Sequence, residues 1–334
     1  MPVGDGDLRS ALEGVLRRPV RALVRRTHPY VSSHAIEDVE VTFEDGAPLA
    51  LVIKDVLAPR REARGAKPPR LLDPAREIET YRHALARAGL DVPTCYGTIE
   101  QPGRRWLVLE AVEGIPLWQT ADAEDWDAAA RWLAGLHARG VPVRRGHLLR
   151  YDAAYLHDWL RHAVALMPRG ALDAVAAVWQ RVVERVAAWP CSIVHGDFYA
   201  SNVLVGRARG VPRVRPVDWE LAGVGPGVLD LAAITSGSWN AAERERIALA
   251  YHRAMPLATR PRRGDFLDVL QHCRLLIAVQ WLGWSRDWSA PAEHAHDWLT
   301  EATALARELG PSGGSHALIR PRSRLTAAAL YAGS

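Results

Sequence analysis

The 334-residue sequence has little lysine, and it has no long apolar segment. Of its 42 basic residues only Lys54 and Lys67 are lysines, and the abundance of alanine beside arginine indicates a GC-rich genome rather than a binding function. No run approaches the roughly 18 apolar residues that a membrane span needs. A lysine that persists in such a chain raises the question of what arginine could not do there.

Cysteine is also scarce. Cys95, Cys191 and Cys273 are odd in number and far apart, which favours neither a disulfide framework nor a metal-binding knuckle. The N-terminal residues MPVGDGDLRS lack the basic-then-apolar pattern of a secretory signal. We therefore expect a protein of the reducing cytoplasm.

The charge balance shows no strong excess of one sign. The formal net charge is +4, with 38 acidic residues spread among the arginines that gather at 17–26 and 60–70. No predicted helix carries a continuous basic face, so the arginines indicate solvated surface rather than a phosphate-backbone footprint. The sequence predicts neither a nucleic-acid nor a membrane partner, and it leaves the oligomeric state open.

The first 111 residues have the patterns of a small sheet with an inserted helix. At roughly 100–200 residues per domain, the whole chain is long enough for two domains or one two-lobed enzyme. Alternation over 39–43 and an apolar run at 49–56, whose single charge is Lys54, predict strands. An amphipathic helix is predicted at 7–26, a second helix from Asp73-Pro74 to about Gly89, and a hairpin from 95–100 and 105–110.

Beyond Gly114 the pattern becomes mostly helical. Helices are predicted at 123–139, 152–166 and 171–188 and from about 229 to 309, with short strands at 192–195, 203–205 and 211–217. A tail at 311–334 follows a Gly/Pro-rich stretch, and we expect it to be poorly ordered. The fold class is therefore α+β, and a cleft between a sheet lobe and a helical lobe is a natural ligand site.

The densest group of polar side chains lies between the short strands. An apolar strand delivers His195 and Asp197, Asn202 follows before a second strand, and Asp218 ends a third. The hairpin turn between the last two strands can fold Asn202 back beside Asp218. Together these two residues offer Mg²⁺ the hard oxygen ligands it prefers, with phosphates and water completing its shell. Asp197 stays available to orient a hydroxyl and accept its proton, which completes a minimal set for phosphoryl transfer.

This arrangement resembles the aminoglycoside phosphotransferase and choline kinase superfamily, which are small-molecule relatives of the protein kinases. The run from His195-Gly196-Asp197 to Asn202 is similar to the family's H-G-D-x-x-x-x-N loop, and Val217-Asp218-Trp219-Glu220 to its I-D-W-E metal motif. Further similar segments are WLVLEAVEGIPL at 106–117, WLAGLH at 132–137 and Asp230 in the pattern D-W-E…D-L-A.

The resemblance covers about residues 30–305 and implies a bilobal protein-kinase-like fold. The N-lobe, 1–111, would be a small antiparallel sheet with one inserted helix that binds nucleotide, and the C-lobe, 112–310, would be larger and mostly helical. It also implies that His195 and His137 support the structure and that Asp230 accepts hydrogen bonds from the loop backbone. A contact of Glu220 with metal or substrate stays open.

The resemblance implies a function for Lys54 as well. In kinase-like enzymes a strand lysine binds the α- and β-phosphates and pairs with a helix glutamate. Tyr81 marks the inward face of the helix that begins near Asp73, and at about 100° per residue Glu77 lies close to that face whereas Glu79 points away. Glu77 is therefore the predicted partner of Lys54.

Two further nucleotide contacts are implied. The hinge-like segment around Glu110 and Val112 would hydrogen-bond adenine through its backbone. The glycine-rich phosphate loop of the protein kinases has no counterpart here, because no glycine lies between Tyr30 and Val41. Ser32 or Ser33 is the candidate phosphate contact in its place, and an ordinary turn is the alternative.

The acceptor is the least defined part of the prediction. Trp281, Trp284 and Trp288 recur at helical spacing, near Asp287, Glu293 and Asp297. Such a stripe favours core packing, and the alternative is an aromatic wall for a sugar or nucleoside. The net positive charge weakly disfavours a polycationic aminoglycoside.

The sequence therefore predicts a magnesium-requiring O-phosphotransferase that transfers the γ-phosphate of ATP, or of GTP, to a hydroxyl of a small molecule. Sugars, nucleosides, amino alcohols and antibiotic-like natural products are the acceptor classes considered. The alternative is a catalytically impaired pseudokinase that binds nucleotide and acts as a sensor or scaffold. A protein kinase is disfavoured because no activation segment is long enough to dock a peptide.

Overall fold

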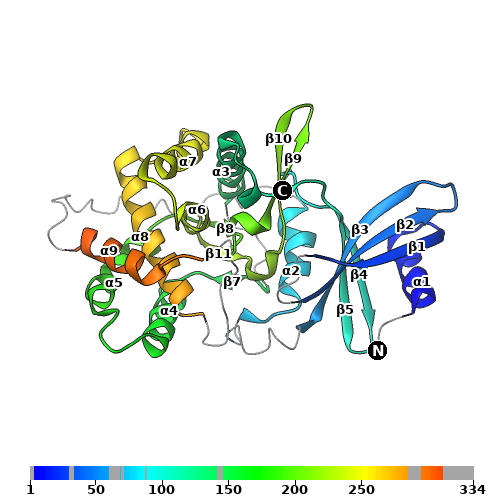
Figure 1. The fold of residues 1–334 in the computed structure, drawn as a ribbon, viewed down its shortest axis with the longest axis horizontal. Coiled ribbons are helices and arrows are strands. Elements are labelled where there is room, and N and C mark those ends of the chain that lie inside the picture. The colour runs from blue at the N-terminus through cyan, green and yellow to red at the C-terminus, as the bar shows by residue number, and fades with distance from the viewer. Residues whose placement is uncertain are drawn as a thin grey trace, which may run out of the picture.

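A computed structural model describes residues 4–29, 34–59, 68, 71–86, 89–140, 146–284 and 295–310. A five-stranded sheet lies at one end of the molecule and most of the helices at the other (Figure 1). The strands are ordered β1-β2-β3-β5-β4, and each neighbouring pair is antiparallel. Their bounds are Val20–Thr27, His34–Phe43, Pro48–Pro59, Arg104–Glu110 and Cys95–Gln101 in that order.

The two faces of this sheet contribute to different cores. Leu51 and Ile53 of β3 belong to a small core that also contains Leu8 and Leu12 of α1 (Asp5–Leu16). Because side chains alternate along a strand, Lys54 faces the other side, together with Val56, which belongs to the large core of the molecule. The strand period therefore directs the lysine toward the helical part of the chain.

The helix predicted at 7–26 is wrong in its second half. The helix α1 ends at Leu16, and Arg17 adopts the left-handed conformation with φ of 54° while its N–H donates to the Glu13 carbonyl. Pro19 disfavours helical backbone at the residue before it, so the chain leaves the helix and forms β1. Pro19 therefore indicates that the helix ends before it, although the amphipathic pattern continues beyond this residue.

The inserted helix lies between β3 and β4, as predicted, but it has two parts. Arg76–Glu79 forms α2, and Thr80–Leu85 continues it as a turn of π-helix, η3. Ile78, Tyr81 and Leu85 are buried in the large core. The predicted end near Gly89 cannot be compared, because residues 87–88 lie outside the described ranges.

The remainder of the described chain is mostly helical. Two three-stranded sheets, β10-β9-β6 and β7-β11-β8, lie among the helices. Several helices begin at a side-chain cap, as at Asp122, Asp152, Asn240 and Asp297. The strands are β6 (Ile115–Pro116), β7 (Leu149–Arg150), β8 (Cys191–Val194), β9 (Val203–Ala208), β10 (Val211–Pro216) and β11 (Gly223–Pro226). The helices are α3 (Ala123–His137), α4 (Ala153–Leu166), α5 (Asp173–Ala187), α6 (Val228–Thr235), α7 (Ala241–Ala254), α8 (Arg263–Leu282) and α9 (Trp298–Glu308), with short 3-10 turns η4 (Leu117–Gln119), η5 (Ala200–Asn202) and η6 (Trp219–Leu221).

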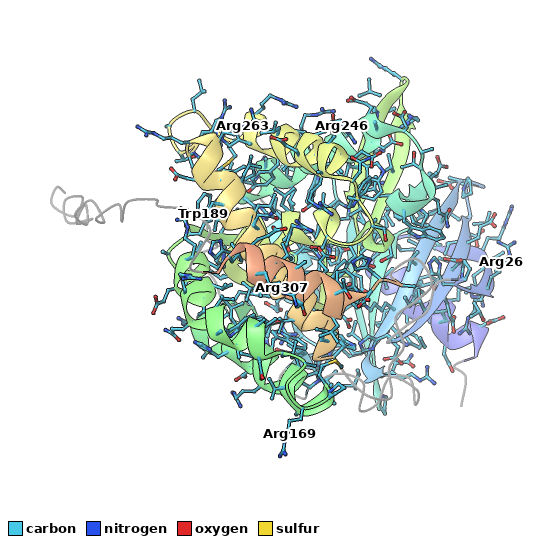
Figure 2. All side chains as sticks on the ribbon, turned by 60° about the vertical axis from the view of Figure 1, so that its left-hand side comes forward. Arg26, Arg169, Trp189, Arg246, Arg263 and Arg307 are labelled. Carbon is cyan, nitrogen blue, oxygen red and sulfur yellow. The ribbon has the colours of Figure 1, made fainter. Side chains whose placement is uncertain are left out.

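The predicted α+β class is therefore confirmed. The tail predicted to be poorly ordered, 311–334, lies outside the described ranges. None of the helices in those ranges has the length and apolar character that crossing a membrane requires. Labelled arginines such as Arg26, Arg169 and Arg263 project from different edges of the molecule (Figure 2), and all three are exposed, as expected for solvated surface.

Candidate active site

The loop after β8 has a conformation that requires glycine at one position. Gly196 has φ of 81°, a backbone conformation that residues with a Cβ rarely adopt. A Cβ there would lie 1.9 Å from the Tyr151 hydroxyl and 2.3 Å from the Leu221 carbonyl oxygen. Tyr151 in turn donates its hydroxyl to that same carbonyl over 2.7 Å, so the loop is packed tightly against both.

A buried carboxylate holds the start of this loop. Asp230, 1% exposed, accepts the His195 N–H over 2.7 Å and the Gly196 N–H over 2.8 Å. The His137 Nε2 atom lies 3.2 Å from the same carboxylate. We call Asp230, His195, Gly196 and His137 the loop anchor. The expectation that Asp230 binds the loop backbone is confirmed by these two hydrogen bonds.

The His195 ring is engaged by backbone on both nitrogens. Nε2 donates to the Val217 carbonyl over 3.0 Å, and Nδ1 accepts the Asp197 N–H over 3.3 Å. Burial lowers the pKa of this histidine, although Asp230 and Asp218 oppose the shift. A neutral ring with both nitrogens occupied supports the loop and is poorly placed to act as an acid or base.

Asp197 and Asn202 lie side by side at the end of the loop. The Asn202 Nδ2 group donates to the Asp197 carbonyl over 3.0 Å and to its Oδ2 over 2.9 Å. The Asn202 carbonyl accepts the Val217 N–H over 2.9 Å, which holds Asn202 next to the segment that carries Asp218. The fold thus brings the three predicted polar residues of the two motifs to one place.

Lys54 joins them from the sheet. Its Nζ lies 2.6 Å from Asp218 Oδ1 and 2.7 Å from Glu77 Oε2. Glu77 is the residue that helix geometry predicted to face the lysine, and its Oε1 also accepts the Trp219 N–H over 3.2 Å. Asp218 has φ of 65°, and the resulting turn presents its carboxylate to the lysine. We call Lys54, Glu77, Asp218 and Glu220 the charge cluster.

The electrostatics of this cluster keep the lysine charged. Burial opposes its charge, but the carboxylates of Asp218, Glu77 and Glu220 outweigh that effect and hold the pKa of Lys54 well above its ordinary value. Burial raises the pKa of Glu77, despite the neighbouring ammonium. The lysine is thus a buried permanent cation, suited to bind polyanionic groups.

Two side chains near Glu220, those of His34 and Arg76, were not predicted from the sequence. His34 Nδ1 lies 2.9 Å from the Asp55 carbonyl, and its Nε2 lies 3.4 Å from Glu220 Oε2. Arg76, 3% exposed, donates to the Glu220, Leu71 and His147 carbonyls. In the sequence, Arg76 could have been noticed because it directly precedes Glu77 in the predicted helix. His34 directly follows the predicted phosphate segment, and Ser32 and Ser33 themselves lie outside the described residues.

The predicted hinge is held by an ion pair. Arg215 of β10 binds the Glu110 carboxylate through two nitrogens, over 2.6 and 2.7 Å, and Thr94 donates to the same carboxylate. These hydrogen bonds lower the pKa of Glu110 to about 2. The Glu110 N–H donates to the Thr94 carbonyl and the Ala111 N–H to the Ala50 carbonyl, so the two residues directly before Val112 are held in place.

The donor set fits a magnesium ion. Because the Asn202 amide nitrogen is directed to Asp197, its oxygen is the atom available to a metal, beside the Asp218 carboxylate. In the described ranges no group of three or more His, Cys, Asp or Glu is arranged to hold a metal. Two protein oxygens, with phosphates and water supplying the rest, are the usual provision for Mg²⁺ in a nucleotide site.

The described tryptophans of the predicted stripe, Trp281 near the end of α8 and Trp284 just after it, are engaged in packing. Trp281 stacks on Trp298 with centroids 5.2 Å apart, and Trp284 stacks on Trp159 at 5.4 Å. Asp297 caps α9 by accepting from the Thr300 N–H and hydroxyl. These contacts agree with the core interpretation of the stripe. Asp287, Trp288 and Glu293 lie outside the described residues.

Comparison with known proteins gives a family and a fold. The profile of the "Phosphotransferase enzyme family" matches residues 36–266. No curated protein sequence matches the chain significantly. Among solved structures, a microcompartment-associated aminopropanol kinase is similar over 92% of this chain and 95% of its own, with 15% identity and a TM-score of 0.59.

Two further structures show the same likeness. A choline kinase from Streptococcus pneumoniae matches over 91% of this chain and 98% of its own, with 15% identity and a TM-score of 0.57. A spectinomycin phosphotransferase matches over 92% and 99%, with 14% identity and a TM-score of 0.54. The predicted bilobal, protein-kinase-like fold is confirmed by these similarities, which at this identity concern the fold alone.

Proposed function

Because the chain belongs to the phosphotransferase enzyme family, we propose that it transfers the γ-phosphate of ATP, or of GTP, to a hydroxyl of a small molecule. One observation carries the proposal. Lys54, Glu77, Asp218, Asn202 and Asp197 come from separate segments of the chain and meet in one place, with a buried cation beside two oxygen donors and a carboxylate. The proteins similar in structure include an aminopropanol kinase, a choline kinase and a spectinomycin phosphotransferase, which supports a small acceptor.

In the proposed reaction Asp197 accepts the hydrogen bond of the acceptor hydroxyl and takes its proton as the oxygen attacks the γ-phosphorus. The bond from that phosphorus to the β,γ-bridging oxygen breaks, and a phosphate monoester and a nucleoside diphosphate result. Lys54 binds the α- and β-phosphates, and Glu77 fixes the direction of its ammonium. Mg²⁺, when held by Asn202 and Asp218, would neutralise negative charge on the phosphates.

The remaining predictions belong to the same proposal. The N-lobe, 1–111, binds nucleotide, with the Glu110 carbonyl and the Val112 N–H on adenine and Ser32 or Ser33 on phosphate. The C-lobe, 112–310, carries the loop and the acceptor site. A cytoplasmic location, where nucleoside triphosphates are available, fits three cysteines that are all free.

The test is a screen of nucleoside diphosphate release. Wild-type protein is incubated with ATP or GTP and Mg²⁺ against libraries of sugars, nucleosides, polyols, hydroxy amides, amino alcohols and antibiotics, and each hit is verified by mass spectrometry of the phosphorylated acceptor. We expect at least one acceptor to raise diphosphate release well above the rate without acceptor. Tight nucleotide binding with no phosphorylated product from any class would favour the pseudokinase alternative.

A further inference from the structure

The helix that carries Glu77 has little stability of its own. The helix α2 has only four residues, and its N-cap residue, Ala75, makes no side-chain hydrogen bond. It continues directly as the turn of π-helix η3, a conformation that occurs mostly as single turns within α-helices. Because isolated helices shorter than roughly 12–15 residues are marginal in water, contacts with other segments must fix the position of α2.

Arg76 makes such contacts with three backbone carbonyls. The helix α2 lies between the five-stranded sheet and the helical end of the molecule (Figure 1), and the Arg76 side chain is buried there. Its Nε donates to the His147 carbonyl over 2.9 Å, and its Nη1 donates to the Leu71 and Glu220 carbonyls, each over 2.8 Å. A guanidinium directs several N–H groups at separate acceptors, whereas the single nitrogen of a lysine could not reach all three carbonyls at once.

Arg76 and Glu77 together attach α2 to the turn that carries Asp218. Arg76 donates to the Glu220 carbonyl, and Glu77 Oε1 accepts the Trp219 N–H over 3.2 Å. Two neighbouring residues of the helix thus bind two neighbouring residues of η6, which directly follows Asp218. These two hydrogen bonds therefore fix the separation of the Glu77 and Asp218 carboxylates, between which the lysine of the charge cluster lies.

The third segment at this place leads into β7. The His147 carbonyl accepts from Arg76, and the His147 Nδ1 atom lies 2.8 Å from Asp73 Oδ2, just before the helix. Two residues further on, the Leu149 N–H donates to the Ala222 carbonyl, directly after η6, over 3.1 Å. The start of α2, the turn η6 and the segment before β7 are thus joined around one buried guanidinium.

We propose, on the basis of the proposed phosphotransferase function, that Arg76 is a positioning residue that holds α2 against η6 in the free protein. Glu77 and Asp218 are then already placed around Lys54 when a nucleotide arrives. Arg76 acts through Glu77 and the η6 turn and not by contact with the reacting groups. The charge cluster is therefore assembled by the fold itself.

Loosening this attachment should reduce nucleotide affinity. If only a fraction of the molecules has the charge cluster assembled, the apparent Kd rises by the inverse of that fraction. A saturating nucleotide restores the assembled arrangement, so KM for the nucleotide should change much more than kcat. A general loss of stability acts differently, because it reduces the number of active molecules and leaves the Kd of the folded ones unchanged.

Arg76→Lys and Arg76→Met test the assignment, and Arg82→Lys is the matched control. Arg82 is exposed on η3 and donates to Thr98 of the neighbouring strand β4. Calorimetry measures the Kd and the number of sites for non-hydrolysable analogues of ATP and GTP, with Mg²⁺ and full-length protein. We expect Kd to rise about fivefold in Arg76→Lys and about tenfold or more in Arg76→Met, with one site per folded molecule. Arg82→Lys should stay within about twofold of wild type.

The order of these effects decides the assignment. Partial retention of affinity by lysine relative to methionine is expected, because an ammonium can still donate to one or two of the carbonyls. A wild-type Kd in Arg76→Lys overturns the proposal, as does an unchanged Kd with fewer binding sites in either variant. Thermal unfolding shows whether each variant is folded, and Arg76→Lys decides alone if Arg76→Met is not.

A second readout needs no nucleotide. Hydrogen exchange of ligand-free Arg76→Lys should be faster than in wild type in peptides that cover 76–85 and 217–222, and unchanged in peptides from α7. Faster exchange throughout the chain, or in neither peptide, would overturn the proposal. The local increase in a protein that binds no nucleotide would retain the function of Arg76 and reject the proposed enzyme. Phosphate transfer that is insensitive to Arg76 would retain the enzyme and reject the assignment.

Discussion

The charge cluster and the loop anchor both contact the segment 217–219, and they use buried carboxylates in different ways. In the charge cluster, Asp218 and Glu77 face the Lys54 ammonium across the interior. In the loop anchor, Asp230 faces two backbone N–H groups of its own loop. Side-chain ion pairs can exchange partners by small rotations, whereas backbone hydrogen bonds are lost only if the loop refolds.

The charge cluster and the loop anchor are therefore suited to different tasks. The charge cluster is suited to exchange its internal ion pairs for phosphates and a metal, and the loop anchor to keep Asp197 in place while that happens. Changes in the charge cluster should therefore alter nucleotide binding and turnover, and changes in the loop anchor should alter stability and turnover together. The following predictions test this difference, from the largest expected effect to the smallest.

Asp197 belongs to neither set, and its removal should affect chemistry alone. We expect Asp197→Ala to reduce kcat by about 10³-fold or more, because general-base assistance and the orientation of the hydroxyl are both lost. Nucleotide affinity, measured by calorimetry, should stay within about twofold of wild type. Turnover close to the wild-type value would reject Asp197 as the group that handles the hydroxyl.

Asp230→Asn should affect stability and turnover together. One of its two acceptor oxygens becomes an amide nitrogen that faces a backbone N–H, so a buried donor loses its acceptor. We expect the free energy of unfolding to fall by about 1–3 kcal/mol and turnover to fall by about tenfold or more, measured by urea denaturation and by product formation. Unchanged stability with low turnover would show that Asp230 acts in the reaction itself, and the proposed difference between the two groups of residues would then be wrong.

Lys54→Arg should act on the nucleotide with little effect on the fold. A planar guanidinium cannot replace a compact ammonium between Glu77, Asp218 and two phosphates. We expect KM for the nucleotide to rise by about tenfold and kcat to fall, with an unfolding midpoint near that of wild type. Glu77→Gln is the matched variant, and it should change the same parameters by a smaller factor. A large loss of stability in both variants would show that the charge cluster also stabilises the fold.

Glu110→Gln should have the smallest effect on stability, and that effect should depend on pH. The pKa of this carboxyl is lowered to about 2 in the folded protein, so its ionised form stabilises the fold above its unfolded pKa of roughly 4.5. That contribution is lost as the pH falls through the folded value. We expect wild type to unfold at a higher urea concentration than the variant at pH 7, and the difference to shrink at pH 3. A difference that is equal at both values would exclude the ion pair with Arg215 as its source.

Much of this architecture could be predicted because it depends on local periodicity. The helix period selected Glu77 over Glu79 as the partner of Lys54, whose own role was implied by the resemblance. The spacing of Asp197, Asn202 and Asp218 around two short strands was enough to bring them together. In these cases the relevant partner is specified by the helical repeat of 3.6 residues or by a tight hairpin.

The unpredicted features depend on contacts between distant segments. Arg76 meets Glu220 across 144 positions, and His34 of β2 meets the same residue through its ring. The end of α1 is different, because Pro19 was a local signal that the amphipathic pattern outweighed.

The contact between Gly196 and Tyr151 has a consequence for the history of the chain. Any side chain at position 196 would overlap the tyrosine hydroxyl, and also the Leu221 carbonyl that the hydroxyl binds. A lineage that acquires a larger residue at position 196 must both lose the tyrosine hydroxyl and move the Leu221 turn, so the order of these changes is constrained. A substitution at position 196 should therefore be accompanied by one at position 151 and by a shift of the backbone at 221, and a substitution at position 196 alone should not be tolerated.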